Sequence, residues 1–422
     1  MSATRVPLSL RLDFGAAGDG ITDDLEPLRA AAASGRHVLI EPGVYRVTRP
    51  STSILRLTSG TTLQGAGRDV TVIRLADWQD GSTYRLLDST AGVTSDCAIR
   101  DLTIDGNRHN QSDRHEQGQG IWLEGTARWV LERLTLRDCR ADGFYVYNGN
   151  TSIVVRDVLS EGHGRDGAVV NATVHGLTIV NSTFRDCAQR AFGAEVFKTG
   201  TDRVLIDGCD FQGRPGLAPV TLGGQSNVAP PERHITFSNN TVTGGGVNTT
   251  RCSNLLIARN RIDASGTRPC IAVRRESQNV VIADNILHHS GAPNLSHGIV
   301  AVAAASQEQP RSVTIRDNHM VSEQPTRGVF ATGVERLMVS GNVMSGSIYL
   351  RSTRHVRSAR VCGNTLVGPP YAWLRADQSP APFDVLMVTG NLVACEDGPV
   401  VDAAVGGDVG SVMFRGNIIE GA

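Results

Sequence analysis

The stretch DGFYVYNGNTSIVVRDVLSEGHGRDGAVVN, residues 142–171, returns to an Asp-Gly pair after 24 residues, from Asp142 to Asp166. The period holds on both sides, because residues 129–200 divide into three consecutive blocks, WVLERLTLRDCRADGFYVYNGNTS, IVVRDVLSEGHGRDGAVVNATVHG and LTIVNSTFRDCAQRAFGAEVFKTG. Self-similarity at such a fixed period is typical of stacked repeat architectures. Each block holds short β-branched runs between Gly, Asn and Asp turns, which predicts a coil of short strands.

A second marker appears downstream, where asparagine recurs at one turn position in SNNTV, ARNRI, ADNIL, RDNHM, SGNVM, CGNTL, TGNLV and RGNII. These asparagines are Asn240, Asn260, Asn285, Asn318, Asn342, Asn364, Asn391 and Asn417. Stacked Asn side chains can bond to each other and to backbone groups that a tight coil would leave unpaired. The two markers predict an all-β fold, a right-handed parallel β-helix of about a dozen rungs.

The N-terminal segment is expected to close one end of this coil. TDDLEPLRAAAAS starts with an N-cap candidate, Thr22, and continues through acidic residues into alanines, which predicts a helix over about residues 22–34. Such a helix would cover strand edges that are otherwise unpaired. We assign residues 1–50 to a leading segment with this capping helix and residues 51–422 to one continuous β-helix domain.

The same segment carries a family resemblance. DFGAAGDGITDD, residues 13–24, followed by HVLIEPGVYRV, residues 37–47, is similar to the opening segment of the pectate-lyase-like β-helix superfamily. That superfamily includes polygalacturonases, lyases, epimerases and phage tailspikes, so the resemblance implies the fold for the whole chain and leaves the reaction open. Many such β-helices resemble trimers, and a homotrimer is therefore an alternative assembly.

Composition excludes several classes of partner. The 41 basic and 42 acidic residues balance, so neither a nucleic acid nor a membrane is expected to bind. The start MSATRVPLSLRLDFG lacks a secretory signal, which favours a cytoplasmic protein, or a phage-associated one released by another route. Eight cysteines without a C-x-x-C pair predict reduced, buried thiols. Cys139, His163 and Cys187 share a register, but ligands strung along ~9.6 Å do not converge on one zinc.

Strand alternation divides the segments GIWLE, GFYVY, GAVVN and AFGAE into two faces. The inward residues are apolar: Ile121, Leu123, Phe144, Val146, Ala168, Val170, Phe192 and Ala194. The outward residues are Trp122, Glu124, Tyr145, Tyr147, Val169, Asn171, Gly193 and Glu195, preceded at the turn by Gln119, Asp142, Asp166 and Arg190. We expect a carbohydrate to bind along this outward face.

Neighbouring rungs lie ~4.8 Å apart, which stacks Asp142 on Asp166 and places Glu195 one rung along. Like charges at that separation cannot both ionise cheaply, so one pKa should rise and give an acid beside a base. Glycoside hydrolysis needs this pair, with carboxyl groups ~5 Å apart for retention or ~6.5–9.5 Å for inversion. The alternative is that Asp-Gly is only a favoured turn dipeptide.

The polygalacturonase resemblance agrees with this pair only in part. Asp142 in RADGFYV and Asp166 in GRDGAVVN each fall on one aspartate of a polygalacturonase motif. The other positions depart, with Arg140 and Ala141 before the first strand and Arg165 before the second.

Mannuronan epimerases carry Asp-Pro-His on the strand that reads FYVYNG here. Tyr145 and Tyr147 occupy the Asp and His positions, so the acid and base pair of that family is absent. A tyrosine can still serve as the base or acid of a lyase if an arginine such as Arg190 lowers its pKa from ~10.

Further residues are assigned supporting roles. Lys198 is the only lysine of the chain, and with Glu195 it is expected to supply charge beside the carboxylates. Trp122, Tyr145 and Tyr147 form the expected sugar platform, with Glu124, Asn171 and Arg190 as binding residues. His115, in the insertion of residues 107–119, and Arg274, in IAVRRES, are also predicted to contact substrate.

We therefore predict an enzyme that acts on a polysaccharide or oligosaccharide, with hydrolysis by Asp142 and Asp166 as the leading reaction. A lyase or uronate epimerase on the same groove, a glycan-binding adhesin like a phage tailspike, and an intracellular enzyme for small metabolites remain alternatives. No cofactor or metal site is predicted, and calcium enters only if the reaction is an elimination.

Overall fold

The computed structural model describes residues 6–49, 53–78, 83–89, 94–111, 117–194, 201–224, 232–291, 298–303, 309–324, 326–368, 374–378, 383–394 and 411–420. The chain divides into two compact units, Met1–Phe211 and Gln212–Ala422. Each unit is described by itself below, and the single continuous domain over residues 51–422 stays a prediction.

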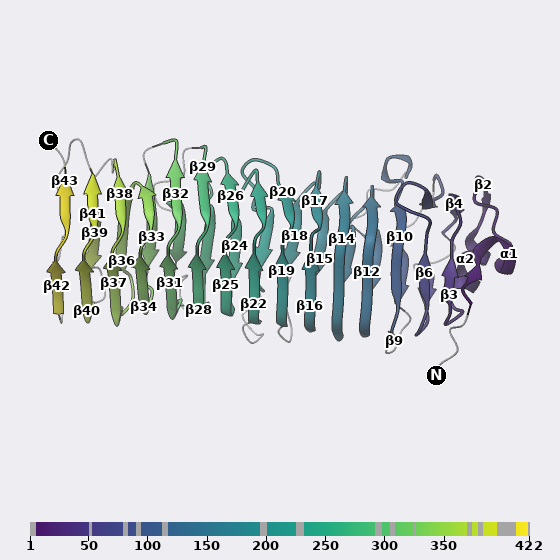
Figure 1. Cartoon of the computed structure of the whole chain (residues 1–422), viewed down its shortest axis with the longest axis horizontal. Helices are drawn as coiled ribbons and strands as arrows, with labels where there is room; N and C mark the ends of the chain where they lie inside the picture. The colour runs from purple at the N-terminus through teal and green to yellow at the C-terminus, as the bar shows by residue number, and fades with distance from the viewer. Residues whose placement is uncertain are drawn as a thin grey trace. The chain divides into compact units, whose positions relative to one another are not determined.

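In the first unit, short parallel strands form two sheets, A and B, and strands of successive rungs lie side by side (Figure 1). Sheet B contains β5 (Ser53–Leu57), β8 (Arg85–Ser89), β11 (Gln119–Leu123), β13 (Phe144–Val146), β15 (Asp166–Val170) and β18 (Arg190–Ala194). Sheet A contains β1 (Leu8–Ser9), β2 (Asp19–Asp23), β3 (His37–Leu39), β4 (Gly43–Val47), β6 (Thr62–Gln64), β7 (Thr71–Leu75), β9 (Thr94–Ser95), β10 (Ala98–Asp105), β12 (Thr126–Arg137), β14 (Asn150–Glu161), β16 (Val174–Val180), β17 (Thr183–Arg185) and β19 (Asp202–Asp207). One further strand, β20 (Asp210–Gln212), contains the boundary between the units.

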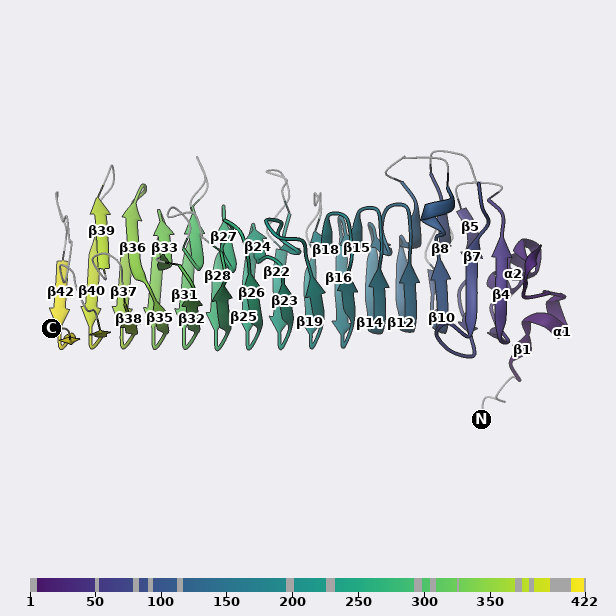
Figure 2. The same cartoon turned by 90° about the horizontal axis from the view of Figure 1, so that it is seen from above.

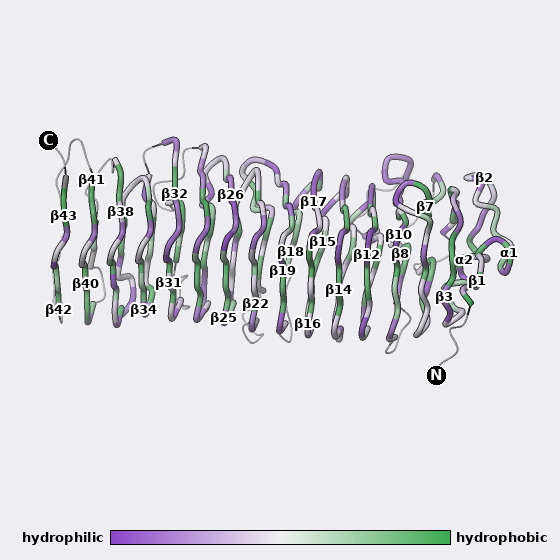
Figure 3. The backbone as a smooth tube through the Cα atoms, viewed as in Figure 1, coloured by the Kyte–Doolittle hydropathy of each residue, from purple (hydrophilic) through white to green (hydrophobic). Residues whose placement is uncertain are grey.

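The predicted period is the register of these rungs. Phe144 pairs with Ala168, and Ala168 pairs with Phe192, each one block of the repeat further along. All eight residues predicted to face inward are at most 4% exposed. Green and purple segments alternate along the strands in Figure 3, as expected when each strand turns one face to the core. The right-handed parallel β-helix is confirmed.

Residues of alternating charge form a row at the C-terminal ends of β10, β12, β14 and β17 in sheet A of this unit. Asp105, Arg137, Glu161 and Arg185 occupy the same position of four successive rungs. Arg137 Nε lies 3.1 Å from Asp105 Oδ2, and Arg185 Nε donates to Glu161 Oε2 at 2.9 Å. Opposite charges thus meet between rungs at a position where identical charges would repel.

Two helices cover one end of the first unit, α1 (Leu10–Phe14) and α2 (Leu25–Ala32) (Figure 2). The capping helix is confirmed by burial of Leu28, Ala31 and Ala32, each 0% exposed. The predicted start was wrong: α2 begins at Leu25 with Asp24 at its N-cap, because the Thr22 hydroxyl donates to Asp19 Oδ2 at 2.8 Å instead. The short helix α1 was not predicted.

In the second unit the same arrangement continues with parallel strands in two sheets. Sheet B contains β21 (Val220–Leu222), β24 (Val247–Thr250), β27 (Ile271–Arg274), β30 (Val300–Ala303), β33 (Arg327–Thr332), β36 (Ser347–Ser352) and β39 (Leu374–Gln378). Sheet A contains β22 (Glu232–Ser238), β23 (Thr241–Thr243), β25 (Cys252–Ala258), β26 (Arg261–Ala264), β28 (Gln278–Ala283), β29 (Ile286–His289), β31 (Ser312–Arg316), β32 (His319–Ser322), β34 (Arg336–Ser340), β35 (Val343–Ser345), β37 (Ser358–Cys362), β38 (Thr365–Val367), β40 (Val385–Thr389), β41 (Leu392–Ala394), β42 (Ser411–Arg415) and β43 (Ile418–Glu420).

The asparagine ladder is confirmed in this unit, at the turns of successive rungs. At each step from Asn240 to Asn417, one asparagine gives its backbone N–H and its Nδ2–H to Oδ1 of the next, at 2.9–3.1 Å. From Asn260 onward each Nδ2 also donates to a backbone carbonyl, for example Asn342 to Ile315 at 2.9 Å. The amide side chain suits this role because it carries donors and an acceptor together.

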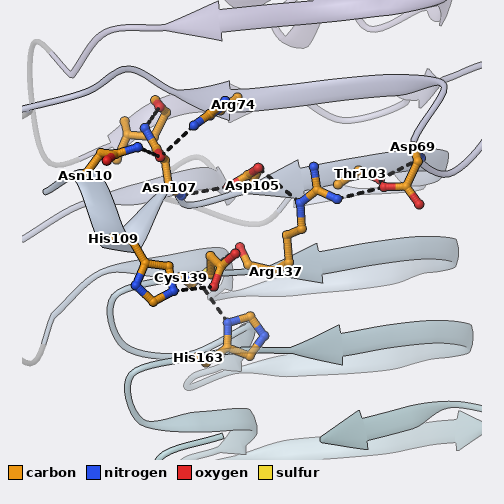
Figure 4. Close-up of polar contacts among 12 residues, drawn as sticks. Asp69, Arg74, Thr103, Asp105, Asn107, His109, Asn110, Arg137, Cys139 and His163 are labelled. Atoms are coloured by element: carbon orange, nitrogen blue, oxygen red, sulfur yellow. Dashed lines mark hydrogen bonds and ion pairs between the residues drawn. The ribbon is translucent and has the colours of Figure 1, made fainter. Parts of the chain in front are cut away.

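Cys139 and His163, which share a register in the repeat, are buried in the interior of the first unit (Figure 4). The Cys139 N–H donates to His163 Nδ1 at 3.2 Å, so the ring proton lies on Nε2 and faces Ser160 Oγ at 2.9 Å. Ser160 Oγ donates in turn to the Gly167 carbonyl at 2.7 Å. Both ring nitrogens are therefore used by protein groups, and burial lowers the pKa of His163 to about 3.

The ladder gives a stability prediction. Asn342→Ala removes two donor contacts to Ile315 and Asn364 and the acceptor for Asn318, leaving buried polar groups unpaired. At about 1 kcal/mol for each hydrogen bond plus the cost of unpaired groups, unfolding free energy should fall by roughly 2–4 kcal/mol. Urea denaturation measures this, with Asn148→Ala, at an exposed asparagine, as the matched control. Equal midpoints for the two variants would contradict the stabilising role.

The buried imidazole predicts a pH dependence of stability. The unfolded state protonates His163 near pH ~6.5 and the folded state only near pH 3, so stability contributed by the neutral ring is lost as pH falls through this window. Comparing His163→Gln with the parent by urea denaturation at several pH values should show a shallower pH slope, by up to about 1.4 kcal/mol per pH unit. Asn148→Ala, which removes no titratable group from an exposed position, is the control and should keep the slope of the parent. Parallel curves for the parent and His163→Gln would refute the assignment.

Candidate functional site

Two neighbouring columns of side chains run along the outward face of sheet B in the first unit. One follows the starts of the strands and comprises Ser53, Arg85, Gln119, Asp142, Asp166 and Arg190. The second comprises Arg56, Asp88, Trp122, Tyr145, Val169 and Gly193. Each rung contributes one residue to each column, so residues of six successive rungs lie on one face.

Asp142 is fully buried beneath an arginine of the next rung. Its side chain is 0% exposed, and Arg165 donates Nε–H to Oδ1 at 2.8 Å and Nη2–H to Oδ2. The Asp166 backbone N–H approaches Oδ1 at 3.3 Å, and Gln119 Nε2 lies 3.4 Å from Oδ2. The two hydrogen bonds between the Arg165 guanidinium and the Asp142 carboxylate are the strong, bidentate form of an ion pair and fix both groups.

Asp166 repeats the arrangement one rung further along. It is 0% exposed, and Arg190 reaches Oδ2 through Nη2 at 2.7 Å and through Nε at 3.1 Å. A Cβ built on Gly193 would lie 2.9 Å from Arg190 Cζ and from Asp166 Oδ2, so the missing side chain makes room for the guanidinium. Burial raises the pKa of Asp166, while the contacts of Arg190 oppose that shift.

The stacked aspartates therefore differ from the predicted acid and base pair. They lie on successive rungs as expected, and the pKa of Asp166 rises as expected, but burial is the largest cause of that rise. Neither carboxylate faces an open trench, because Arg165 and Arg190 cover them. Glu195 and Lys198, predicted to complete this column, lie outside the described residues.

The aromatic residues stack on each other more than they present faces to a ligand. Trp122 and Tyr145 are parallel within 6° at a centroid distance of 4.5 Å, and the Arg85 guanidinium lies 3.7 Å from the Trp122 ring centre. Since β8 and β13 flank β11 on opposite sides, both faces of the indole are covered. A sugar stacked on the flat of Trp122 is thus excluded. Tyr147, 5.3 Å from Trp122, is only partly buried and remains at the margin of the stack.

Two polar side chains next to this stack form hydrogen bonds with the Tyr145 hydroxyl and the Trp122 indole N–H. Asn171 Nδ2 donates to the Tyr145 hydroxyl at 2.7 Å, and Trp122 Nε1 donates to Glu124 Oε2 at 3.1 Å. Glu124 itself is exposed. These predicted binding residues are therefore grouped as expected, with Asn171 and Glu124 fixing the edges of the aromatic cluster.

The remaining predicted positions fall elsewhere. His115 lies outside the described residues, and Arg274 is an exposed residue at the end of β27 in the second unit. In the first part of the insertion, a turn of 3₁₀ helix, η1 (Arg108–Asn110), follows Asn107 (Figure 4). Asn107 Oδ1 accepts from Arg74 at 2.9 Å, and His109 Nε2 lies 3.3 Å from Asp138 Oδ1.

Sequence reasoning missed Arg56, Arg85 and Asp88 and read Arg165 only as a departure from a motif. Asp88 is 3% exposed, accepts from Ser53 Oγ at 2.5 Å and lies 3.4 Å from Arg85 Nη1. Burial raises the pKa of Asp88. The sequence did not reveal these residues because an insertion separates Arg85 from its partner Gln119. This insertion interrupts the repeat by which the later rungs were aligned.

Among the described residues, no cluster of His, Cys, Asp or Glu side chains is arranged to hold a metal ion. The helices that are described are also too short or too polar to cross a membrane.

Comparisons with known proteins agree with this fold. A family model described as "Rhamnogalacturonase A/epimerase, pectate lyase-like" matches residues 11–213, and one described as "Right handed beta helix region" matches residues 166–344. Mannuronan C5-epimerase AlgE2 of Azotobacter vinelandii is 32% identical over 232 residues, 52% of this chain and 23% of the epimerase. Alginate lyase 7 of the same organism is 30% identical over 198 residues, 40% of this chain and 23% of the lyase.

A solved structure extends the likeness in fold. The A-module of mannuronan C-5 epimerase AlgE6 from Azotobacter vinelandii aligns with a TM-score of 0.55 at 20% identity, over 98% of this chain and 99% of the module. The repeat, the parallel rungs and these matches agree on the right-handed β-helix fold, and residues 11–213 carry the resemblance to the pectate-lyase-like proteins.

Proposed function

We propose that the outward face of sheet B in the first unit binds a polyuronate chain and removes the proton at C5 of one uronate residue. Epimerases and eliminating lyases share this step. The observation that carries the proposal is a row of fixed guanidinium groups, Arg85, Arg165 and Arg190, beside two tyrosines. This face lies within the part of the chain that resembles "Rhamnogalacturonase A/epimerase, pectate lyase-like" proteins.

The arginines are suited to an acidic glycan because their positions are already set. Arg165 and Arg190 are only 11% and 21% exposed, and each is anchored by a fully buried aspartate. A side chain held in this way loses little conformational entropy when it binds an anion. In this proposal Asp142 and Asp166 are positioning residues that hold the guanidinium groups toward the glycan.

The tyrosines supply the proton chemistry. A uronate C5–H is acidic because its carboxylate can take up the developing charge, and an adjacent guanidinium stabilises that charge. Tyr147 is the proposed base, since its ring is partly exposed, while Tyr145 is buried and its hydroxyl is held by Asn171. Return of a proton to the opposite face gives epimerisation, whereas breakage of the C4–O bond gives an unsaturated uronate.

Hydrolysis is not proposed. It needs a carboxylic acid within reach of the glycosidic oxygen, and both aspartates are closed beneath arginines. A glycan-binding protein without turnover is the second candidate, favoured by the two tyrosines that stand where the epimerases carry Asp and His.

The reaction is tested by incubating the protein with polymannuronate in D₂O. An epimerase should place deuterium at C5 of new guluronate residues, seen by NMR, whereas a lyase should give an unsaturated uronate that absorbs in the ultraviolet and carries no hydrogen at C5. New reducing ends without either signal would mean hydrolysis and would overturn the proposal. Binding without any product would support the glycan-binding alternative.

The base is tested by Tyr147→Phe, which removes one oxygen. Loss of a general base should lower turnover by roughly 10²–10⁴-fold, while the dissociation constant for polymannuronate stays within about twofold. Tyr349→Phe, the same change in the second unit, is the control and should leave both quantities unaltered. Full turnover by Tyr147→Phe would remove this residue from the reaction.

A further inference from the structure

A hollow of about 470 Å³ opens between α2 and β5, at the end of the first unit that the helices cover. Its lining contains Arg29, Ala33, Ser53, Ile54 and Arg56. Two arginines and a serine thus face one space that is large enough for part of a small ligand. The proton transfer described above uses none of these residues.

The polar groups of this hollow are held in place by backbone and side-chain contacts. Arg29 Nε donates to the Ile54 carbonyl at 3.0 Å, and its Nη1 pairs with Glu26 at 2.9 Å. Arg56 Nη2 donates to Ser53 Oγ at 3.1 Å. The hollow is therefore lined by positive charge whose positions are fixed from α2 on one side and β5 on the other.

A buried carboxylate lies directly behind the serine. Ser53 Oγ donates to Asp88 Oδ2, whereas Asp88 Oδ1 is buried and has no hydrogen-bond partner among the residues that the structure describes. An unpaired buried carboxylate oxygen is costly, so each such atom in a native protein calls for a donor. Through the Ser53 hydroxyl, which donates to Asp88 and accepts from Arg56 Nη2, this carboxylate fixes the serine at the wall of the hollow.

The hollow continues the column that carries the proposed reaction. Arg56 and Asp88 occupy the same position of their rungs as Trp122 and Tyr145. The first strand of the column is β5, and α2 lies against it, with Arg29 bonded to the β5 backbone. A glycan that follows the column toward the N-terminus reaches this hollow and meets α2 there.

We propose that this hollow is an end subsite, which binds the terminal uronate residue of an acidic glycan. The carboxylate of that residue pairs with Arg29 and Arg56. This inference rests on the proposed function, because it assumes that a polyuronate lies along the column. Its consequence is that the protein engages polyuronates from a chain end, with helix α2 as the stop.

The first test is Arg56→Gln, chosen because this side chain is exposed and its loss should not unfold the cap. The dissociation constant for a six-residue oligomannuronate is measured by calorimetry. Loss of one charge-assisted contact to the terminal carboxylate should weaken binding about tenfold. Arg128→Gln, at an exposed arginine of sheet A that pairs with Asp96, is the control and should bind like the parent.

The second test is stoichiometry. Sedimentation of the parent protein with polymannuronates of several lengths should show a fixed number of proteins per chain, whatever the chain length. A number that grows with length, or equal affinity of Arg56→Gln and the control, would overturn the end subsite while leaving the proposed function intact. If the parent binds no oligomannuronate, the proposed function fails together with this inference.

Discussion

In a stacked coil, the nearest neighbours of a side chain are the residues at the same position of the rungs before and after it. Parallel pairing at a constant period imposes this constraint, and every outward or turn position becomes a column. A polar residue in such a column that is shielded from water must then be satisfied by its counterpart one rung away. The two units meet this requirement with different chemistry.

In the second unit the solution is repetition of one residue. Asparagine can follow asparagine indefinitely, since each amide oxygen accepts from the previous rung and each amide nitrogen donates to the next. In the first unit the solution is alternation, as in the row Asp105, Arg137, Glu161 and Arg185. A charged residue cannot repeat itself in the next rung without repulsion, so its partner must carry the opposite sign.

This constraint decides what the sequence could predict. The fold followed from the period and from the asparagines, because both are visible as spacing, and the inward residues followed from alternation. The placement of Asp142 and Asp166 on successive rungs was also predictable, but their burial and their pairing with arginines were not. Each neutralising arginine lies one rung further along at a different offset, Arg165 directly before Asp166 and Arg190 opposite it. Pairing between rungs is set by side-chain reach, which spacing does not encode.

Pairing of side chains between neighbouring rungs also explains a departure from the family motifs. Arg165 stands where polygalacturonases carry the first aspartate of an Asp-Asp pair, so this position has no carboxylate here, and the Arg165 side chain covers the carboxylate of Asp142. Arg190 fits over Asp166 only because Gly193 leaves its place empty. A face built for hydrolysis keeps its carboxylates within reach of the substrate, whereas this face places guanidinium groups above them and tyrosines beside them. The departures at Tyr145, Tyr147 and Arg165 therefore change which groups a bound sugar would meet without altering the coil that presents them.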